Sequence, residues 1–362
     1  MFTSPLRKSN SFRLRRIIIG AALLLQLSLC QTLCGDAEGD GDSDYNQAID
    51  IFLLSGEVAL EKMHIANIFH GIIAEGGSSV FAGPIASGEA KSYEKFCPID
   101  LRTRINGCRF GFSKTFTTIE QRGGQISIYG GIVHGNGSVF AEDNNLFFKF
   151  SRNDFAIASS ARFFRRKSSG LSCSTNVAIS FGSGSIKCTD GKLYIDDGGD
   201  YCRKFHDSDL QVSVFESRGL FRRGEVEISC IAGLRMDLIA QNNFMERDGM
   251  GDESEDIGKL RHRMLTTELA AKIEDAQPNA MHLFGKIGWQ CAVLRKYSGG
   301  PDANDVKTMP QRITYGNRHS ATISVGISHR LAKDFICSLT MEDHFGSKRA
   351  SNTATITIYR TF

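Results

Sequence analysis

The segments SATISVGISHRL (320–331), DFICSLTMEDHF (334–345) and SNTATITIYRTF (351–362) end the chain and decide its fold class. Each segment alternates apolar and polar residues with a period of two, and short turn-like stretches separate them. Because successive residues of a β-strand point to opposite faces, each segment forms a strand with one apolar and one polar face. The pattern predicts consecutive antiparallel strands, whose apolar face could meet either protein or lipid.

The same alternation extends upstream over most of the chain. From about residue 104 alternating segments such as GQISIYGGIVH (124–134) and DLQVSVF (209–215) are separated by glycine-containing turns. Glycine is frequent, with 37 residues, and proline is rare, with 6, as expected for a protein of many strands and turns. Residues 76–95 show no clear period and are predicted to be a loop. The sequence therefore predicts an all-β protein.

The strand predicted at residues 225–239 indicates what the apolar face contacts. Strands of soluble proteins usually have about 5–6 residues, whereas about 9–11 strand residues cross a bilayer. The polar face of this longer strand carries charged residues that suit a water-filled interior, and the strands predicted at 261–274 and 280–294 behave similarly. Its apolar face consists of Val226, Ile228, Cys230, Ala232, Leu234, Met236 and Leu238.

Long strands with one apolar and one polar face, joined by alternating short and long connections, are typical of a transmembrane antiparallel β-barrel. The longest polar connections, 242–259 and 298–317, are predicted to be exposed loops. Beyond residue 35 the sequence has no other long apolar run, and only helices and closed barrels satisfy their backbone within lipid. A secreted soluble β-protein, such as a sandwich or a β-helix, is the alternative at this point.

The first 35 residues are predicted to be a secretory signal peptide. Five basic residues precede an apolar run at 17–29, and the small residue Gly35 precedes a plausible cleavage point. Residues 36–95 follow as an acidic lead-in and a helical segment. Within this part, residues 57–74 repeat apolar side chains at helical spacing. Residues 96–362 are then the predicted barrel.

No motif in the chain predicts catalysis or a cofactor. Patterns for a nucleophile elbow, a phosphate-binding loop or an HExxH zinc helix are absent from the sequence. The nearly balanced charge, with 43 basic and 40 acidic residues, gives no sign of nucleic-acid binding. The pairs His206-Asp207 and Asp343-His344 are adjacent in the chain, so on a strand their side chains point to opposite faces. We predict that the protein is not an enzyme and binds no metal or nucleic acid.

Eight of the ten cysteines follow the signal peptide, in an exported chain where disulfides can persist. Those near predicted turns could pair, namely Cys97 with Cys108, and Cys173, Cys188 and Cys202 among themselves. Three others lie on apolar strand faces and are predicted to be small buried side chains: Cys230, Cys291 and Cys337.

From about residue 226 to the C-terminus the chain resembles the autotransporter β-domain, the translocator barrel of type V secretion. The resemblance rests on short motifs in the order and spacing of that family, while residues 104–225 match only in strand character. The motifs are FMERDG (244–249), LRHR (260–263) leading into TELAA (267–271), LFGKIGW (283–289), VGISHRL (325–331) before Asp334-Phe335, and the terminal aromatic Phe362.

The resemblance implies a 12-stranded transmembrane β-barrel with an N-terminal helix in or near its lumen, a position that residues 57–74 would fill. It also implies a monomer in the cell outer membrane, with the lipid bilayer and the outer-membrane barrel-assembly machinery as partners. Only residues 36–95 precede the predicted barrel. We therefore expect a translocator or surface-anchored unit without a sizeable passenger; an outer-membrane channel or an adhesin-like protein that binds through its long loops is the alternative.

The last strand carries the only functional residues that we predict individually. Ala354, Ile356, Ile358 and Phe362 share one face, and Arg360 interrupts it. We predict that these four apolar residues form a barrel assembly signal, which is presented to the insertion machinery by pairing along the free edge of the strand.

Overall fold

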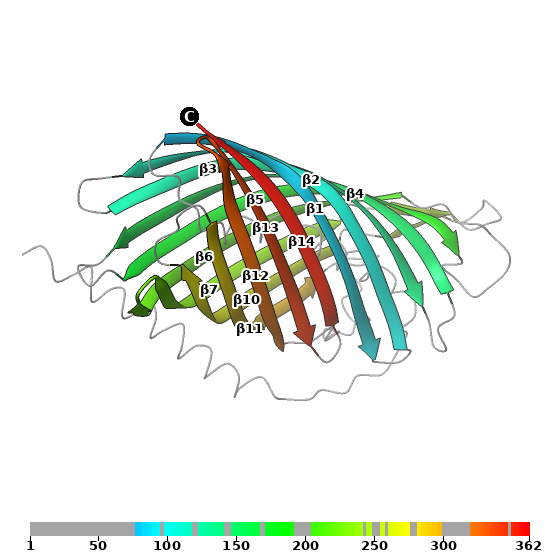
Figure 1. Cartoon of the computed structure of the whole chain (residues 1–362). Coiled ribbons are helices and arrows are strands. Elements are labelled where there is room, and N and C mark those ends of the chain that lie inside the picture. Colours follow the sequence, from blue (N-terminus) through cyan, green and yellow to red (C-terminus); the bar gives the residue numbers. More distant parts are fainter. Residues whose placement is uncertain are drawn as a thin grey trace, which may run out of the picture. The chain divides into compact units, whose positions relative to one another are not determined.

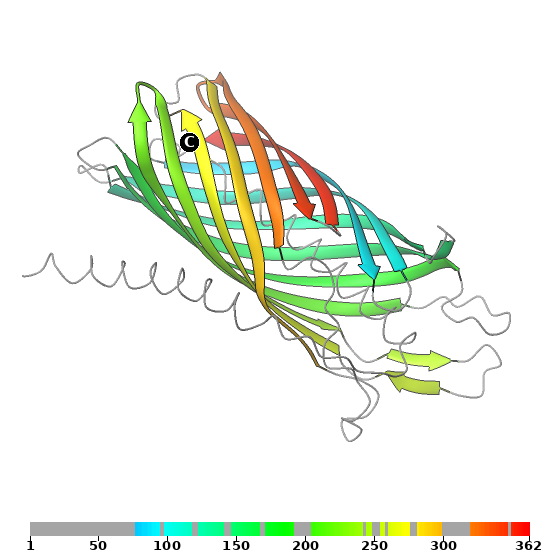
Figure 2. The same ribbon diagram turned by 90° about the horizontal axis from the view of Figure 1, so that it is seen from below.

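The computed structural model describes the chain from residue 77 to residue 362, except for residues 95–97, 118–121, 141–145, 167–170, 192–203, 242–243, 248–253, 258–259, 276–280, 299–318 and 347–348. The regular elements of the described residues are all β-strands, and twelve of them form a closed barrel (Figures 1 and 2). The barrel strands are β1 (Gly77–Glu94), β2 (Pro98–Thr117), β3 (Arg122–Phe140), β4 (Leu146–Arg166), β5 (Ser172–Gly191), β6 (Lys204–Arg223), β7 (Val226–Gln241), β10 (Leu260–Asp275), β11 (Met281–Ser298), β12 (His319–Ala332), β13 (Phe335–Gly346) and β14 (Arg349–Thr361).

Every barrel strand pairs antiparallel with its two neighbours, and β1 pairs with β14 to close the sheet. The strands β7 and β10 are neighbours because β8 (Phe244–Arg247) and β9 (Ser254–Ile257) form a separate two-stranded ribbon. Closure leaves no barrel strand with an unpaired edge. The prediction of an all-β, 12-stranded antiparallel barrel is confirmed.

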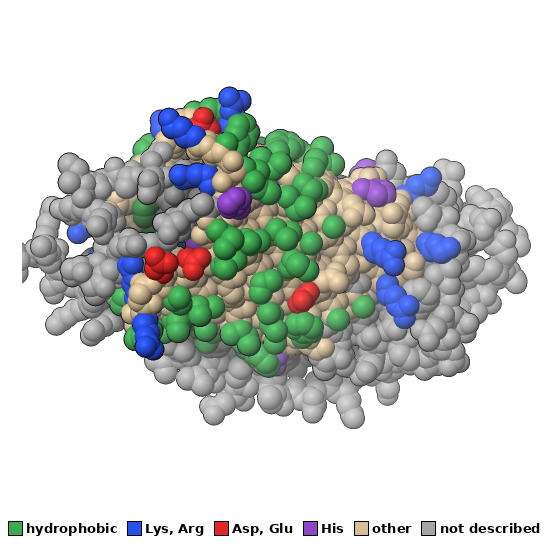
Figure 3. Space-filling view, viewed as in Figure 1, with side chains coloured by type: hydrophobic (Ala, Val, Ile, Leu, Met, Phe, Trp, Pro, Cys, Tyr) green, Lys and Arg blue, Asp and Glu red, His purple; other side chains and the backbone are tan. Residues whose placement is uncertain are grey.

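Burial in the barrel is inverted relative to a soluble protein. Large apolar side chains on the outer face are half exposed, for example Ile132 at 53% and Trp289 at 50%, whereas the inward-facing Arg109 and Arg152 are only 1% and 2% exposed. Figure 3 shows the apolar side chains as a band across the outer face, with basic side chains gathered toward both ends. Exposed apolar surface of this extent, on strands of 12 to 21 residues, is what a lipid-facing wall requires.

The faces of β7 agree with the alternation read from its sequence. Leu234 and Met236 point outward and are 44% and 40% exposed, while Ser229 and Asp237 point inward and are buried. Ile231, which breaks the alternation, is also inward and packs against Phe215 and Ala270. The lumen therefore contains apolar clusters between its polar residues.

Residues 76–95 are not the loop that the sequence suggested, because β1 begins at Gly77 and the barrel starts there rather than at residue 96. The inward residues of β1 include Phe81 and Ile85, but the residues between them are Ala82, Gly83 and Pro84. Small residues and a proline hide the strand period, and pairing with β2 and β14 imposes the strand conformation regardless.

The cysteine predictions are only partly right. Cys291 is buried as predicted, but Cys230 is exposed, because the apolar face of β7 lies on the outside of the barrel and not in a core. Cys108 and Cys173, for which disulfides were considered, are free thiols. Cys97 and Cys202 lie outside the described residues.

The two ends of the barrel differ in their connections. At one end, here called the terminal end, β1 begins, β14 finishes, and tight turns join β6 to β7 and β12 to β13. At the other, the loop end, lie the long connections 242–259 and 299–318, of which the first contains the β8–β9 ribbon (Figure 2, yellow-green). In bacterial outer-membrane barrels short turns face the periplasm and long loops face outward. The predicted signal peptide and the helix at 57–74 lie outside the described residues, and the described residues include no helix long and apolar enough to cross a membrane.

Candidate functional site

The barrel closes at a seam between its first and last strands, which joins residues from opposite ends of the described chain. β1 and β14 run antiparallel, with Ser79 opposite Thr361 at the terminal end and Lys91 opposite Arg349 at the loop end. The strand predicted to carry the assembly signal thus forms one side of this seam.

The backbone ladder of the seam is interrupted near its middle. Pairing with β14 stops before Gly83 and Pro84 and resumes at Ile85; a proline has no N–H group to donate to a ladder. The two backbones nevertheless touch. A Cβ added to Gly83 would lie 2.8 Å from the Thr357 Cα and would overlap the carbonyl oxygen of Ile356. Only glycine fits this close approach.

A buried arginine spans the interruption from the inside. Arg109 of β2 lies opposite Gly83, and its Nη2 donates a hydrogen bond of 2.8 Å to the Thr357 Oγ1 of β14. The guanidinium carbon lies 5.6 Å from the centroid of the Phe81 ring. Because Gly83 has no side chain, Arg109 passes over β1 and links β2 directly to β14.

The C-terminal residues fix the seam at the terminal end. The Phe362 N–H donates to the Ser78 carbonyl oxygen, and the Thr361 N–H donates to the Asp334 carbonyl oxygen, each over 2.9 Å. Gly77 has a φ of 116°, and a Cβ there would lie 2.9 Å from the carbonyl oxygen of Phe362. The last two residues are therefore bonded to β1 and to the β12–β13 turn.

The four predicted assembly residues form one outward strip of β14. Ile356, Ile358 and Phe362 are exposed on the outer face, and Ala354 lies half-buried in the same row. The structure thus brings these residues together on the face that we attribute to lipid.

Arg360, which interrupts this strip, also points outward, and it rests on aromatic rings. Its guanidinium carbon lies 5.6 Å from the centroid of the Phe335 ring and 5.7 Å from that of Phe362. A guanidinium over aromatic faces is favourable. At the rim of the barrel, the charge is therefore accommodated without breaking the apolar strip.

A second buried arginine spans a strand in the wall. Arg152 of β4 donates from Nε to Asp154 Oδ2 over 2.7 Å and forms an ion pair with Asp207 of β6, with Nη2 and Oδ2 2.7 Å apart. The strand between them, β5, contributes Gly184, where a Cβ would lie 2.7 Å from the Arg152 Nη2. As at the seam, a glycine in the middle strand lets an arginine reach across it.

A lysine makes a third such connection, on the side of the lumen formed by β10 to β13. Lys286 Nζ lies 2.9 Å from Glu268 Oε1 and 3.4 Å from Glu342 Oε2. Glu342 also accepts a hydrogen bond of 2.5 Å from Ser324, and its Oε1 lies 2.8 Å from the Nε2 of His344. These paired charges tie four neighbouring strands together on the inside.

The adjacent His–Asp pairs behave as their position in strands predicts. His206 and Asp343 lie on the outer face, while Asp207 and His344 are buried on the inner face. Neither pair converges on one point. Among the described residues no group of three His, Cys, Asp or Glu side chains could hold a metal ion.

Sequence reasoning missed Arg109 and Arg152. Each acts across an intervening strand, and the bond from Arg109 joins residues 248 positions apart. A possible signal was a large basic residue at an inward position of a strand, paired with a glycine in the next strand. Such a signal requires the register, which the sequence alone does not supply.

No protein-family profile and no curated protein sequence matches the chain. Solved structures do match its fold. The translocator domain of the autotransporter NalP from Neisseria meningitidis aligns with a TM-score of 0.59 and 11% identity, over 86% of this chain and 98% of that one. The transport unit of the autotransporter AIDA-I from Escherichia coli gives 0.61 and 10%, over 85% and 98%. The β-domain of the Bordetella autotransporter BrkA gives 0.54 and 11%, over 79% and 100%.

These three structures and this chain share one fold, the closed 12-stranded barrel of autotransporter translocator domains. The resemblance found from the last third of the sequence therefore extends, as a fold, over most of the chain.

Proposed function

We propose that the protein is an outer-membrane β-barrel of the autotransporter type, which acts as a translocator or as an anchor for its own N-terminal segment. The observation that carries the proposal is the closed 12-stranded barrel with an apolar outer wall, in which β1 starts at the same end as the C-terminus. The segment before Gly77 must therefore join the barrel at its terminal end.

The predicted helix at residues 57–74 has the length to thread the lumen. Eighteen residues of α-helix span about 27 Å, close to the roughly 30 Å of a bilayer core. Apolar clusters on the inner wall, such as that of Ile85, Ile105, Val133 and Ala156, offer a surface for the apolar face of such a helix. Residues 36–56 would then emerge at the loop end.

The experiment is to insert a protease site and an epitope after Ser43 and to treat intact cells. We expect the epitope at the cell surface and sensitive to added protease, and found in the medium if the segment is released. An epitope that is protected in intact cells, together with ion conductance through the purified barrel, would contradict the proposal and favour the channel alternative.

The proposal includes export by the signal peptide, insertion by the barrel-assembly machinery and a monomeric state. We propose that Ala354, Ile356, Ile358 and Phe362 are the assembly signal, since they form one outward strip of the last strand. Deletion of Phe362 removes the bond to Ser78 and should lower the amount of heat-modifiable, folded barrel in the outer membrane. Unchanged assembly of this deletion would remove the role given to the strip.

A further inference from the structure

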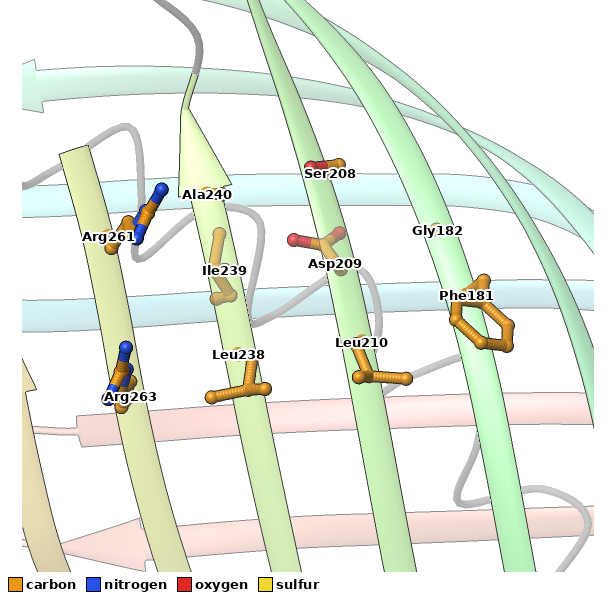
Figure 4. A pocket seen from close by; sticks show the side chains of 10 residues that line it. All are labelled: Phe181, Gly182, Ser208, Asp209, Leu210, Leu238, Ile239, Ala240, Arg261 and Arg263. Carbon is orange, nitrogen blue, oxygen red and sulfur yellow. The ribbon is translucent and has the colours of Figure 1, made fainter. Parts of the chain in front are cut away.

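A shallow groove crosses the outer wall of the barrel near the loop end, on the strands β5, β6, β7 and β10. Its volume is about 320 Å³. Figure 4 shows the arginines of β10 at one side of the groove and apolar side chains of the next three strands beside them. The residues that matter to its chemistry are Arg261, Arg263, Leu238, Leu210, Phe181 and Ser208.

Strand register explains the shape of the groove. One row across the wall runs from Arg263 to Leu238, then to Leu210 and Phe181, each opposite the next. The row above it, two residues nearer the loop end, begins at Arg261 and continues with small residues, Ala240 and Ser208. The small side chains leave a hollow beside Arg261, above an apolar floor.

The charge of the groove is one-sided. Arg261 and Arg263 are both exposed on the outer face, and no described residue forms an ion pair with either guanidinium. Asp209 lies next to Leu210, but its side chain is buried toward the lumen and does not face the arginines. The groove therefore combines two available guanidinium groups with an apolar surface, on a wall that faces lipid.

We propose that this groove binds one phosphorylated glycolipid of the outer leaflet, of the lipid A class. A guanidinium binds a phosphate through two parallel hydrogen bonds, and the Ser208 hydroxyl can donate a further one. An acyl chain lying over Leu238, Leu210 and Phe181 gains about 0.8 kcal/mol per buried CH₂ group. The proposal rests on the outer-membrane orientation proposed above, in which the loop end faces outward and the arginines reach the headgroup layer.

The test uses the full-length mature chain, folded in detergent and titrated with diphosphoryl lipid A under native mass spectrometry. We expect one tightly bound lipid per barrel. The double variant R261Q/R263Q should lose affinity about tenfold or more, because each guanidinium bond to a charged phosphate is worth roughly 1.5–3 kcal/mol. Lipid A without phosphates should bind the wild type and this variant equally weakly.

The chain offers a matched control. Arg102 and Arg104 of β2 have the same spacing, point outward and lie toward the same end of the barrel. The variant R102Q/R104Q should retain wild-type affinity. An equal loss in both variants would mean that general basic charge holds the lipid, and would overturn the site.

Two further arms keep the result decisive. Inorganic phosphate at the same concentration should not compete with the lipid; if it does, the ligand is a free anion and the proposal is wrong. Should R261Q/R263Q fail to show heat-modifiable folding, A240L fills the hollow without changing charge and should weaken binding by a similar factor; wild-type affinity there would overturn the proposal. Binding to the purified barrel does not depend on translocation, so a protected N-terminal epitope in cells would leave this outcome independent.

Discussion

The seam and the wall each contain a buried arginine that reaches across a glycine to the next strand but one. In the wall, Arg152 passes over Gly184 to Asp207. At the seam, Arg109 passes over Gly83 to Thr357. The side-chain device is the same, but the backbone beneath it differs.

Pairing of β5 with β4 and β6 continues through Gly184, whereas pairing of β1 with β14 breaks at Gly83 and Pro84. The wall thus has both a continuous ladder and an ion pair at the crossing. The seam has a hydrogen bond to a hydroxyl where its ladder is missing. The comparison teaches that closure depends on local side-chain and backbone fit at one point, and that the seam is the strand pair that separates most easily.

The largest effect is expected from Gly83→Ala. The new Cβ would overlap the backbone of β14, which cannot move without opening the seam. We expect little or no folded barrel by heat-modifiable migration. Gly184→Ala meets the ends of side chains instead and should cost about 1–3 kcal/mol, as overpacking usually does. Gly135→Ala, whose Cβ would lie 3.5 Å from its nearest neighbour, is the control and should fold normally.

Arg152→Met should be the most destabilising of the arginine substitutions. It leaves two buried carboxylates, Asp154 and Asp207, without this partner, and breaking a buried pair from one side costs about 3–5 kcal/mol. Urea unfolding in lipid vesicles measures the change. The same substitution in an Asp207→Asn background should cost less, and an equal cost in both backgrounds would show that the ion pair is not the source.

Arg109→Met should cost less, about 1.5–3 kcal/mol, the value of a hydrogen bond to a charged group. The loss should appear mainly as faster unfolding that starts at the seam, detected by hydrogen exchange of the β1 and β14 amides. Exchange that rises equally in β5 would argue against a local role for Arg109.

The smallest effect is expected from Arg360→Ala. Its guanidinium rests on Phe335 and Phe362 at an exposed rim, where such contacts contribute about 0.5–1 kcal/mol. The variant should assemble normally and unfold at slightly lower urea concentration. A severe assembly defect would mean that the charge itself is recognised.

The alternation of apolar and polar residues was sufficient to predict the fold, because a barrel wall must present one face to lipid along every strand. Residues 226–241 show this clearly, with an outward Leu234 and an inward Asp237. The prediction failed at β1, where Gly83 and Pro84 hide the period. It failed there because the constraint is the close approach of β14, more than 250 residues away in the sequence, and not a local preference.

The contacts of the site were less predictable than the fold. The outward strip from Ala354 to Phe362 follows from the strand period alone. The crossings of Arg109 and Arg152 depend on which residue lies two strands away, and Arg360 looked like a defect until Phe335 was found beside it in the register. Sequence patterns give faces, while the register decides which side chains meet.

The most direct test of the account is whether β1 closes the barrel against β14. Ser87 and Thr353 are register partners on the inner face, and their hydroxyl oxygens lie 3.2 Å apart. In a chain whose native cysteines are replaced by serine, the double variant S87C/T353C should form an intramolecular disulfide in the folded protein, identified by mass spectrometry of the linked peptides. Folded barrel that forms no such link under oxidising conditions, or that forms it only after unfolding, would contradict the closed 12-stranded barrel.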